Sequence, residues 1–116
     1  MATPKTVSSD FLGISATSIF TVAAGKRCRI KELEFHNIDT SAVQIRIWLA
    51  PNDSGSVRTV ADDDRYQRIK VNIPAGETLY FELGWSMEDE NDTIQAKAAT
   101  ASKISSSIHY IEESKE

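Results

Sequence analysis

Short stretches in which apolar and polar residues alternate run along most of this chain, separated by turn residues. In the clearest stretch, residues 42–50, apolar side chains fill every second position from Val43 to Leu49. A period of two is typical of a strand with one buried face. No run of ten or more residues keeps a helical period, so the pattern predicts an all-β, two-layer antiparallel sandwich, jelly-roll-like, with seven or eight strands. The other predicted strands cover residues 18–23, 27–37, 67–73, 79–83, 93–98 and 103–111.

The apolar positions change phase within the second of these strands. Cys28 and Ile30 share one parity, whereas Leu33 and Phe35 occupy the other. One continuous strand cannot bury both pairs on the same side of a sheet. We therefore predict a β-bulge near Lys31, because one extra residue returns the second pair to the core face.

The beginning of the chain lacks this patterning. Residues 1–16 are rich in Ser, Thr and Ala and follow neither a period of 2 nor one of 3.6. They predict an extended N-terminal arm, followed by a single β-sandwich domain at 17–116. Phe11, Leu12 and Ile14 are the candidate anchors through which this arm would contact a partner protein.

Composition and charge exclude several classes of function. The chain has 116 residues, of which 41% are hydrophobic and 26% charged, as expected for one globular domain. Its net charge is -4 and its longest basic run is the pair Lys26 and Arg27, which argues against a nucleic-acid partner. No apolar stretch approaches the roughly 20 residues of a membrane span and no export signal opens the chain, so no membrane partner is expected.

No catalytic or metal-binding motif surrounds the residues that could carry chemistry. Cys28 is the only cysteine and lies on the inward parity, while neither His36 nor His109 stands in a nucleophile or zinc motif. The acidic runs at 62–64 and 88–92 do not match a calcium-loop pattern and are predicted to be solvated. We therefore expect no enzymatic activity, no cofactor and no metal. A small hydrolase that uses Cys28 with a histidine is kept as a third alternative.

Large aromatic side chains at outward positions are the best remaining signal of a binding surface. Trp48 and Tyr80 lie on the polar parity of their strands, and Trp85 follows a glycine at the end of its strand. Exposed aromatic side chains are costly unless covered, and they are enriched at the centres of protein interfaces. Two interpretations stay open, a protein interface and coverage by another segment of the same chain. A stacking platform for carbohydrate is a third.

Several short turn and strand segments follow one another along residues 18–112. They are Ala-Ala-Gly-Lys at 23–26, His-Asn at 36–37, an apolar strand that ends at Leu49, Ile-Pro-Ala-Gly-Glu-Thr at 73–78 and Glu-Asn-Asp-Thr-Ile-Gln-Ala at 90–96. This order resembles that of small β-sandwich virion proteins of tailed bacteriophages.

The resemblance implies a structural virion protein, a capsid cement or decoration protein that binds and stabilises the head lattice. Its partners would be the major capsid protein or other virion proteins. It would also form a homo-oligomer, such as a trimer with its seam on the outward face of 42–50. A tail, baseplate or head-fibre adaptor is the nearest alternative, and a carbohydrate-binding module is an alternative of another class. The expected location is the virion, after synthesis in the host cytoplasm.

Overall fold

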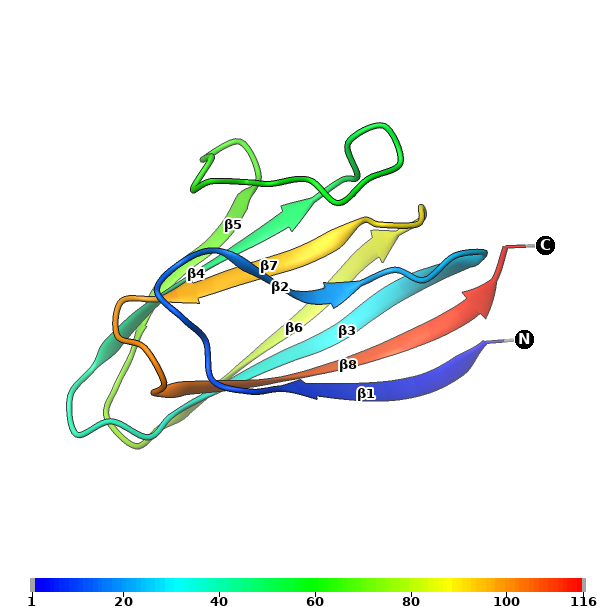
Figure 1. Ribbon diagram of the computed structural model, residues 1–116. Coiled ribbons are helices and arrows are strands. Elements are labelled where there is room, and N and C mark those ends of the chain that lie inside the picture. The colour runs from blue at the N-terminus through cyan, green and yellow to red at the C-terminus, as the bar shows by residue number, and fades with distance from the viewer. Residues whose placement is uncertain (1, 116) are drawn as a thin grey trace.

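The computed structural model describes residues 2–115, which form eight strands and no helix (Figure 1). The predicted all-β class is therefore confirmed. Within this part of the chain there is no helix that is long and apolar enough to cross a membrane. The strands are β1 (Thr3–Ser9), β2 (Thr17–Thr21), β3 (Lys26–Asn37), β4 (Val43–Ala50), β5 (Gln67–Ile73), β6 (Thr78–Met87), β7 (Thr93–Ala98) and β8 (Ile104–Ser114).

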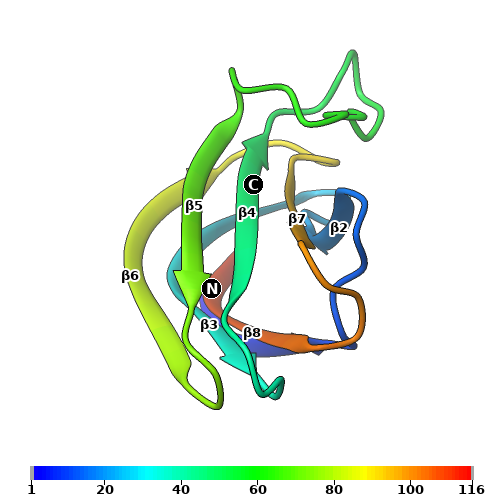
Figure 2. The ribbon, with the colours of Figure 1, turned by 90° about the vertical axis from the view of Figure 1, so that its left-hand side faces the viewer.

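The strands form two four-stranded antiparallel sheets that face each other (Figure 2). The first sheet has the order β1-β8-β3-β6, and the second sheet has the order β2-β7-β4-β5. Strands from opposite ends of the chain are thus neighbours, as β1 and β8 show. Eight antiparallel strands in two sheets, with most successive strands passing from one sheet to the other, form a jelly roll. The expected jelly-roll-like sandwich is confirmed.

The hydrophobic core lies between the two sheets and is built from the alternating residues. In β4, Val43, Ile45 and Ile47 point inward and are buried, as their spacing predicts. Leu33 and Phe35 of β3 face them from the first sheet and are also fully buried. Burying one such side chain contributes about 1.5–3 kcal/mol, so this core is the main source of stability. Other large core side chains that are fully buried are Val22, Ile30, Ile73, Met87, Ile94, Ile104 and Ile108.

The predicted β-bulge in β3 is confirmed. The pairing of β3 shifts between Ile30 and Glu32 relative to both of its neighbours, β6 and β8. Against β8, Lys31 is the extra residue, and its insertion lets Leu33 and Phe35 face the same core as Cys28. Against β6, the extra residue lies on β6, between Glu82 and Trp85.

The predicted N-terminal arm is not observed, and the sandwich begins before residue 17. Thr3–Ser9 form β1, which pairs along its whole length with β8, from Thr3 opposite Glu112 onward. Leu12 is 4% exposed and belongs to the core. The prediction was wrong because an edge strand with polar residues on both faces shows no apolar alternation. Its backbone groups nevertheless complete the hydrogen bonding of β8, which would otherwise be an open edge.

Candidate functional site

Trp48 was a candidate for an exposed interface residue, but it is fully buried. Its ring lies on the outer face of the second sheet, where the loop of residues 51–66 covers it with Val60 and Tyr66. The Arg46 guanidinium lies 4.9 Å from the ring centroid. The interpretation of an exposed Trp48 was wrong, and the alternative of coverage by the same chain is confirmed. The proposed trimer seam on this face of β4 is thus partly occupied by the chain itself.

The two other aromatic candidates lie on different surfaces. Tyr80 of β6 is 60% exposed and points outward from the first sheet, as its parity predicts. Trp85 lies opposite Ile30 and packs, half-buried, against the core. The three rings therefore do not share one face, and the alternative of a carbohydrate platform built from Trp48, Tyr80 and Trp85 is not supported by their positions.

Three exposed apolar side chains, Phe11, Ile14 and Ile38, lie in loops at one end of the sandwich, which we name the apolar loop end. These side chains are 47%, 63% and 51% exposed. Phe11 and Ile14 lie in the β1–β2 loop, and Ile38 follows β3. Ile38 was not among the residues predicted from the sequence, because its only signal there is a single aliphatic residue within a polar turn.

Backbone hydrogen bonds tie both of these loops to the segment between β7 and β8. All three connections lie at the same end of the sandwich (Figure 1). The Leu12 amide donates to the Ile104 carbonyl at 2.8 Å, and the Ser102 amide donates to the Leu12 carbonyl at 3.2 Å. The Ile38 amide donates to the Lys103 carbonyl at 3.0 Å. The buried Leu12 side chain anchors the β1–β2 loop, so its neighbour Phe11 is presented on a fixed backbone.

The structure does not bring a cysteine and a histidine together for catalysis. Cys28 faces the core, whereas His36 and His109 lie on the outer face of the first sheet. His36 Nδ1 lies 2.7 Å from the hydroxyl of Thr78 in the neighbouring strand β6, and the two groups are hydrogen-bonded. The hydrolase alternative therefore loses the geometry on which it depended.

Burial raises the pKa of the Cys28 thiol from its ordinary value of 9.0 to about 11, and nearby Glu112 adds to the rise. The folded protein then holds the thiol proton more tightly than the unfolded chain, so stability is lost as the pH rises from about 9 to about 11. We expect the free energy of unfolding to fall by about 2–3 kcal/mol over this interval, since one pKa unit is about 1.4 kcal/mol.

Urea unfolding of the wild-type protein and of Cys28→Ala at a series of pH values tests this expectation. Tyr110, whose pKa burial also raises, titrates in both proteins, so the difference between them reports Cys28. A difference in unfolding free energy that stays constant between pH 8 and 11 would contradict the prediction.

The two acidic runs have protein partners in the structure. In the first run, Asp62 lies 2.6 Å from the Lys97 ammonium, and Asp64 lies 3.3 Å from the Arg46 guanidinium. In the second run, the Asp92 carboxylate accepts a hydrogen bond from the Asn52 amide at 2.8 Å. Neither run gathers three metal-ligating atoms among residues 2–115. The group that does so, Glu32, Glu34 and His109, lies on the outer face of the first sheet.

No protein-family model matches the chain, and no curated protein sequence matches it. Solved structures do resemble it. A structure described as Bacillus endospore appendages that form disulfide-linked pili has a TM-score of 0.55 and 14% identity, over 97% of this chain and 88% of that one. The Tobacco streak virus coat protein has a TM-score of 0.52 and 7% identity, over 97% of this chain and 85% of that one. At these identities the likeness establishes the fold alone, a jelly-roll β-sandwich.

Proposed function

We propose that this chain is a structural virion protein of a tailed bacteriophage, a cement or decoration protein that binds the capsid lattice through the apolar loop end. The proposal joins the family resemblance in the sequence to one structural observation. That observation is the presence of three exposed apolar side chains, Phe11, Ile14 and Ile38, on hydrogen-bonded loops at one end of the sandwich. The partner is the major capsid protein, and the protein is a homo-oligomer on the particle, as the resemblance implies.

The comparisons support an assembly role in general terms. One similar fold belongs to a viral coat protein and the other to a protein that forms pili. The residues that a hydrolase or a carbohydrate-binding module would need are not arranged for those functions in this chain. The Cys28 and histidine side chains lie apart, and the three aromatic rings do not form a common stacking surface.

Burial of the apolar loop end against a partner would contribute substantially to the free energy of binding. Each of the three side chains still exposes about half of its surface, so complete burial adds about 1 kcal/mol per side chain. Three such contributions correspond to an affinity change of about 100-fold.

Co-sedimentation with heads of the encoding phage that were assembled without this protein tests the proposal. We expect the triple variant Phe11→Ser, Ile14→Ser and Ile38→Ser to bind about 100-fold more weakly than the wild type. The matched control is Tyr80→Ser, which removes an equally exposed aromatic ring from a different surface and should bind normally. Far-UV circular dichroism and melting temperatures confirm that both variants are folded.

Other outcomes decide between the alternatives. Binding to tails and not to heads would replace the cement role by that of a tail or baseplate adaptor. Equal binding by the triple variant and the wild type would remove the apolar loop end from the mechanism. Binding to neither particle would overturn the virion role.

A further inference from the structure

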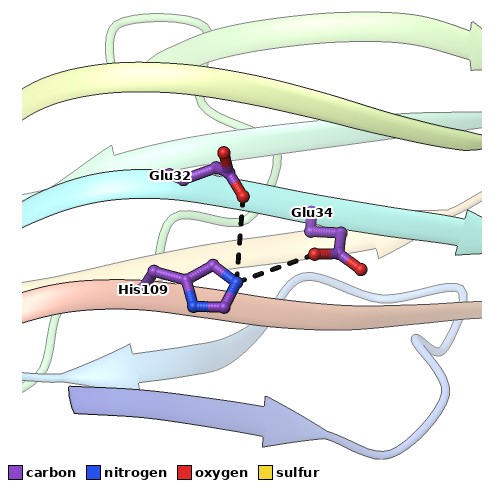
Figure 3. Close-up of side chains that lie close together, drawn as sticks. All are labelled: Glu32, Glu34 and His109. Atoms are coloured by element: carbon purple, nitrogen blue, oxygen red, sulfur yellow. Dashed lines mark ion pairs between the residues drawn. The ribbon is translucent and has the colours of Figure 1, made fainter.

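Three side chains with metal-ligating atoms converge on the outer face of the first sheet: Glu32 and Glu34 from β3 and His109 from β8 (Figure 3). The His109 Nε2 atom lies 3.8 Å from Glu32 Oε1 and 3.6 Å from Glu34 Oε2. The three ligand atoms all lie within 4.8 Å of one another. Each side chain is about one-third exposed, so the group is accessible from solvent yet partly enclosed.

The strand register places these residues together. Glu32 lies directly opposite His109 in the β3–β8 pairing, and Glu34 is two residues further along the same face. The bulge decides which side chain meets the histidine. Tyr110 pairs with Ile30, so without the extra residue Lys31 would lie opposite His109 and would place an ammonium group there. With the bulge, a carboxylate takes that position.

A hydrogen bond from a third strand orients the imidazole ring. The Thr6 hydroxyl of β1 lies 3.0 Å from His109 Nδ1, on the side of the ring away from the carboxylates. When Nδ1–H donates to that hydroxyl, Nε2 carries a lone pair that faces two carboxylates. Metal-binding histidines characteristically donate their second ring nitrogen in this way, which fixes both tautomer and orientation.

We propose that Glu32, Glu34 and His109 bind a divalent transition-metal ion, for which Zn²⁺ is the probe. An imidazole nitrogen with two carboxylate oxygens suits such an ion better than Mg²⁺ or Ca²⁺, which prefer oxygen ligands alone. Zinc bonds to these atoms are about 2.0–2.2 Å long, so two ligand atoms of one ion lie at most about 4.4 Å apart. The separations of His109 Nε2 from the two glutamates, 3.6 and 3.8 Å, satisfy that limit. The two glutamate oxygens lie within 4.8 Å of each other, so a small rotation of one side chain brings them to the same distance.

Two further charged side chains face the same group. Glu82 of β6 lies opposite Glu32 and, with Lys31, lines the shallow depression beside His109. Because residues paired across strands share one face, the Glu82 carboxylate is the candidate for a fourth ligand. The Lys31 ammonium opposes cation binding, so Lys31→Gln is expected to raise the zinc affinity.

Calorimetric titration of the metal-free, full-length protein with Zn²⁺ at pH 7.5 tests the proposal. We expect one Zn²⁺ to bind per chain, and the affinity to fall at least about tenfold in His109→Gln and, separately, in Glu34→Gln. The matched control is His36→Gln, which removes the other histidine of the same sheet face and should bind Zn²⁺ like the wild type. Mg²⁺ at the same concentration should give no saturable binding.

A second readout separates binding from loss of structure. Saturating Zn²⁺ should raise the melting temperature of the wild type and of His36→Gln but not that of His109→Gln, because a ligand of the folded state stabilises it. Absence of saturable binding would overturn the proposal and leave His109 as an ion-pair partner of the two glutamates. Equal affinity in His109→Gln and the wild type, or an equal loss in His36→Gln, would also overturn it. Neither readout involves virus particles, so the outcome is independent of the proposed function.

Discussion

Replacing Trp48 by alanine is expected to destabilise the protein by about 3–5 kcal/mol, the cost of removing a large aromatic side chain from a packed interior. Trp48 is fully buried, and it packs against Ala50, Val60 and Tyr66 beneath the loop of residues 51–66. Without the indole ring, this loop loses the apolar surface on which it lies. Urea unfolding monitored by far-UV circular dichroism measures the change.

Two further variants make this result specific. Trp48→Phe keeps an aromatic ring beneath Val60 and should destabilise the protein less than Trp48→Ala does. Tyr80→Ala removes an exposed ring and should change the free energy of unfolding by about 0.5 kcal/mol or less. If Trp48→Ala were as stable as Tyr80→Ala, the loop would not cover the ring in solution.

Leu12 and Phe11 are expected to give opposite results although they are adjacent in the sequence. Leu12→Ala should destabilise the protein by about 2–5 kcal/mol because Leu12 is 4% exposed and packs in the core. Phe11→Ala should change the free energy of unfolding by only about 0.5 kcal/mol because Phe11 lies on the surface. Parallel urea titrations of the two variants give this comparison directly.

Deleting residues 1–16 extends the same test to the whole segment. The deletion removes β1 and Leu12 together, so it exposes the edge of β8 and opens the core. We expect the melting temperature to fall by about 10 °C or more, since 1 kcal/mol corresponds to about 4–8 °C in a domain of this size. A truncated protein that melts like the full chain would restore the interpretation of residues 1–16 as an independent arm.

The sequence by itself determined the class of the fold and most of its strands. Alternation in β4 predicted which side chains face the core, and the change of phase between Ile30 and Leu33 predicted the bulge. Both are local properties, because the side-chain period of a strand depends only on its backbone geometry and on which face is buried. The inward position of Cys28 and the outward position of Tyr80 follow from the same rule.

The tertiary structure decided the features that depend on distant segments. The polar strand β1 forms because β8 offers it an edge, and Trp48 is buried because the loop of residues 51–66 folds back over it. Ile38 joins Phe11 and Ile14 at one end only through the packing of loops from separate strands. No alternation within these segments could reveal such contacts, since each depends on a segment outside the strand or loop itself.

The group of Glu32, Glu34 and His109 illustrates the same distinction. In the sequence, the candidate metal ligands are the acidic runs at 62–64 and 88–92, where the carboxylates are consecutive. Consecutive side chains in a strand point to opposite faces of the sheet. Side chains two residues apart in one strand lie on the same face, and so do side chains paired across two strands. Glu32 and Glu34 satisfied the first condition in the sequence. Only the register of β3 against β8, displaced by one residue at the bulge, placed His109 beside them.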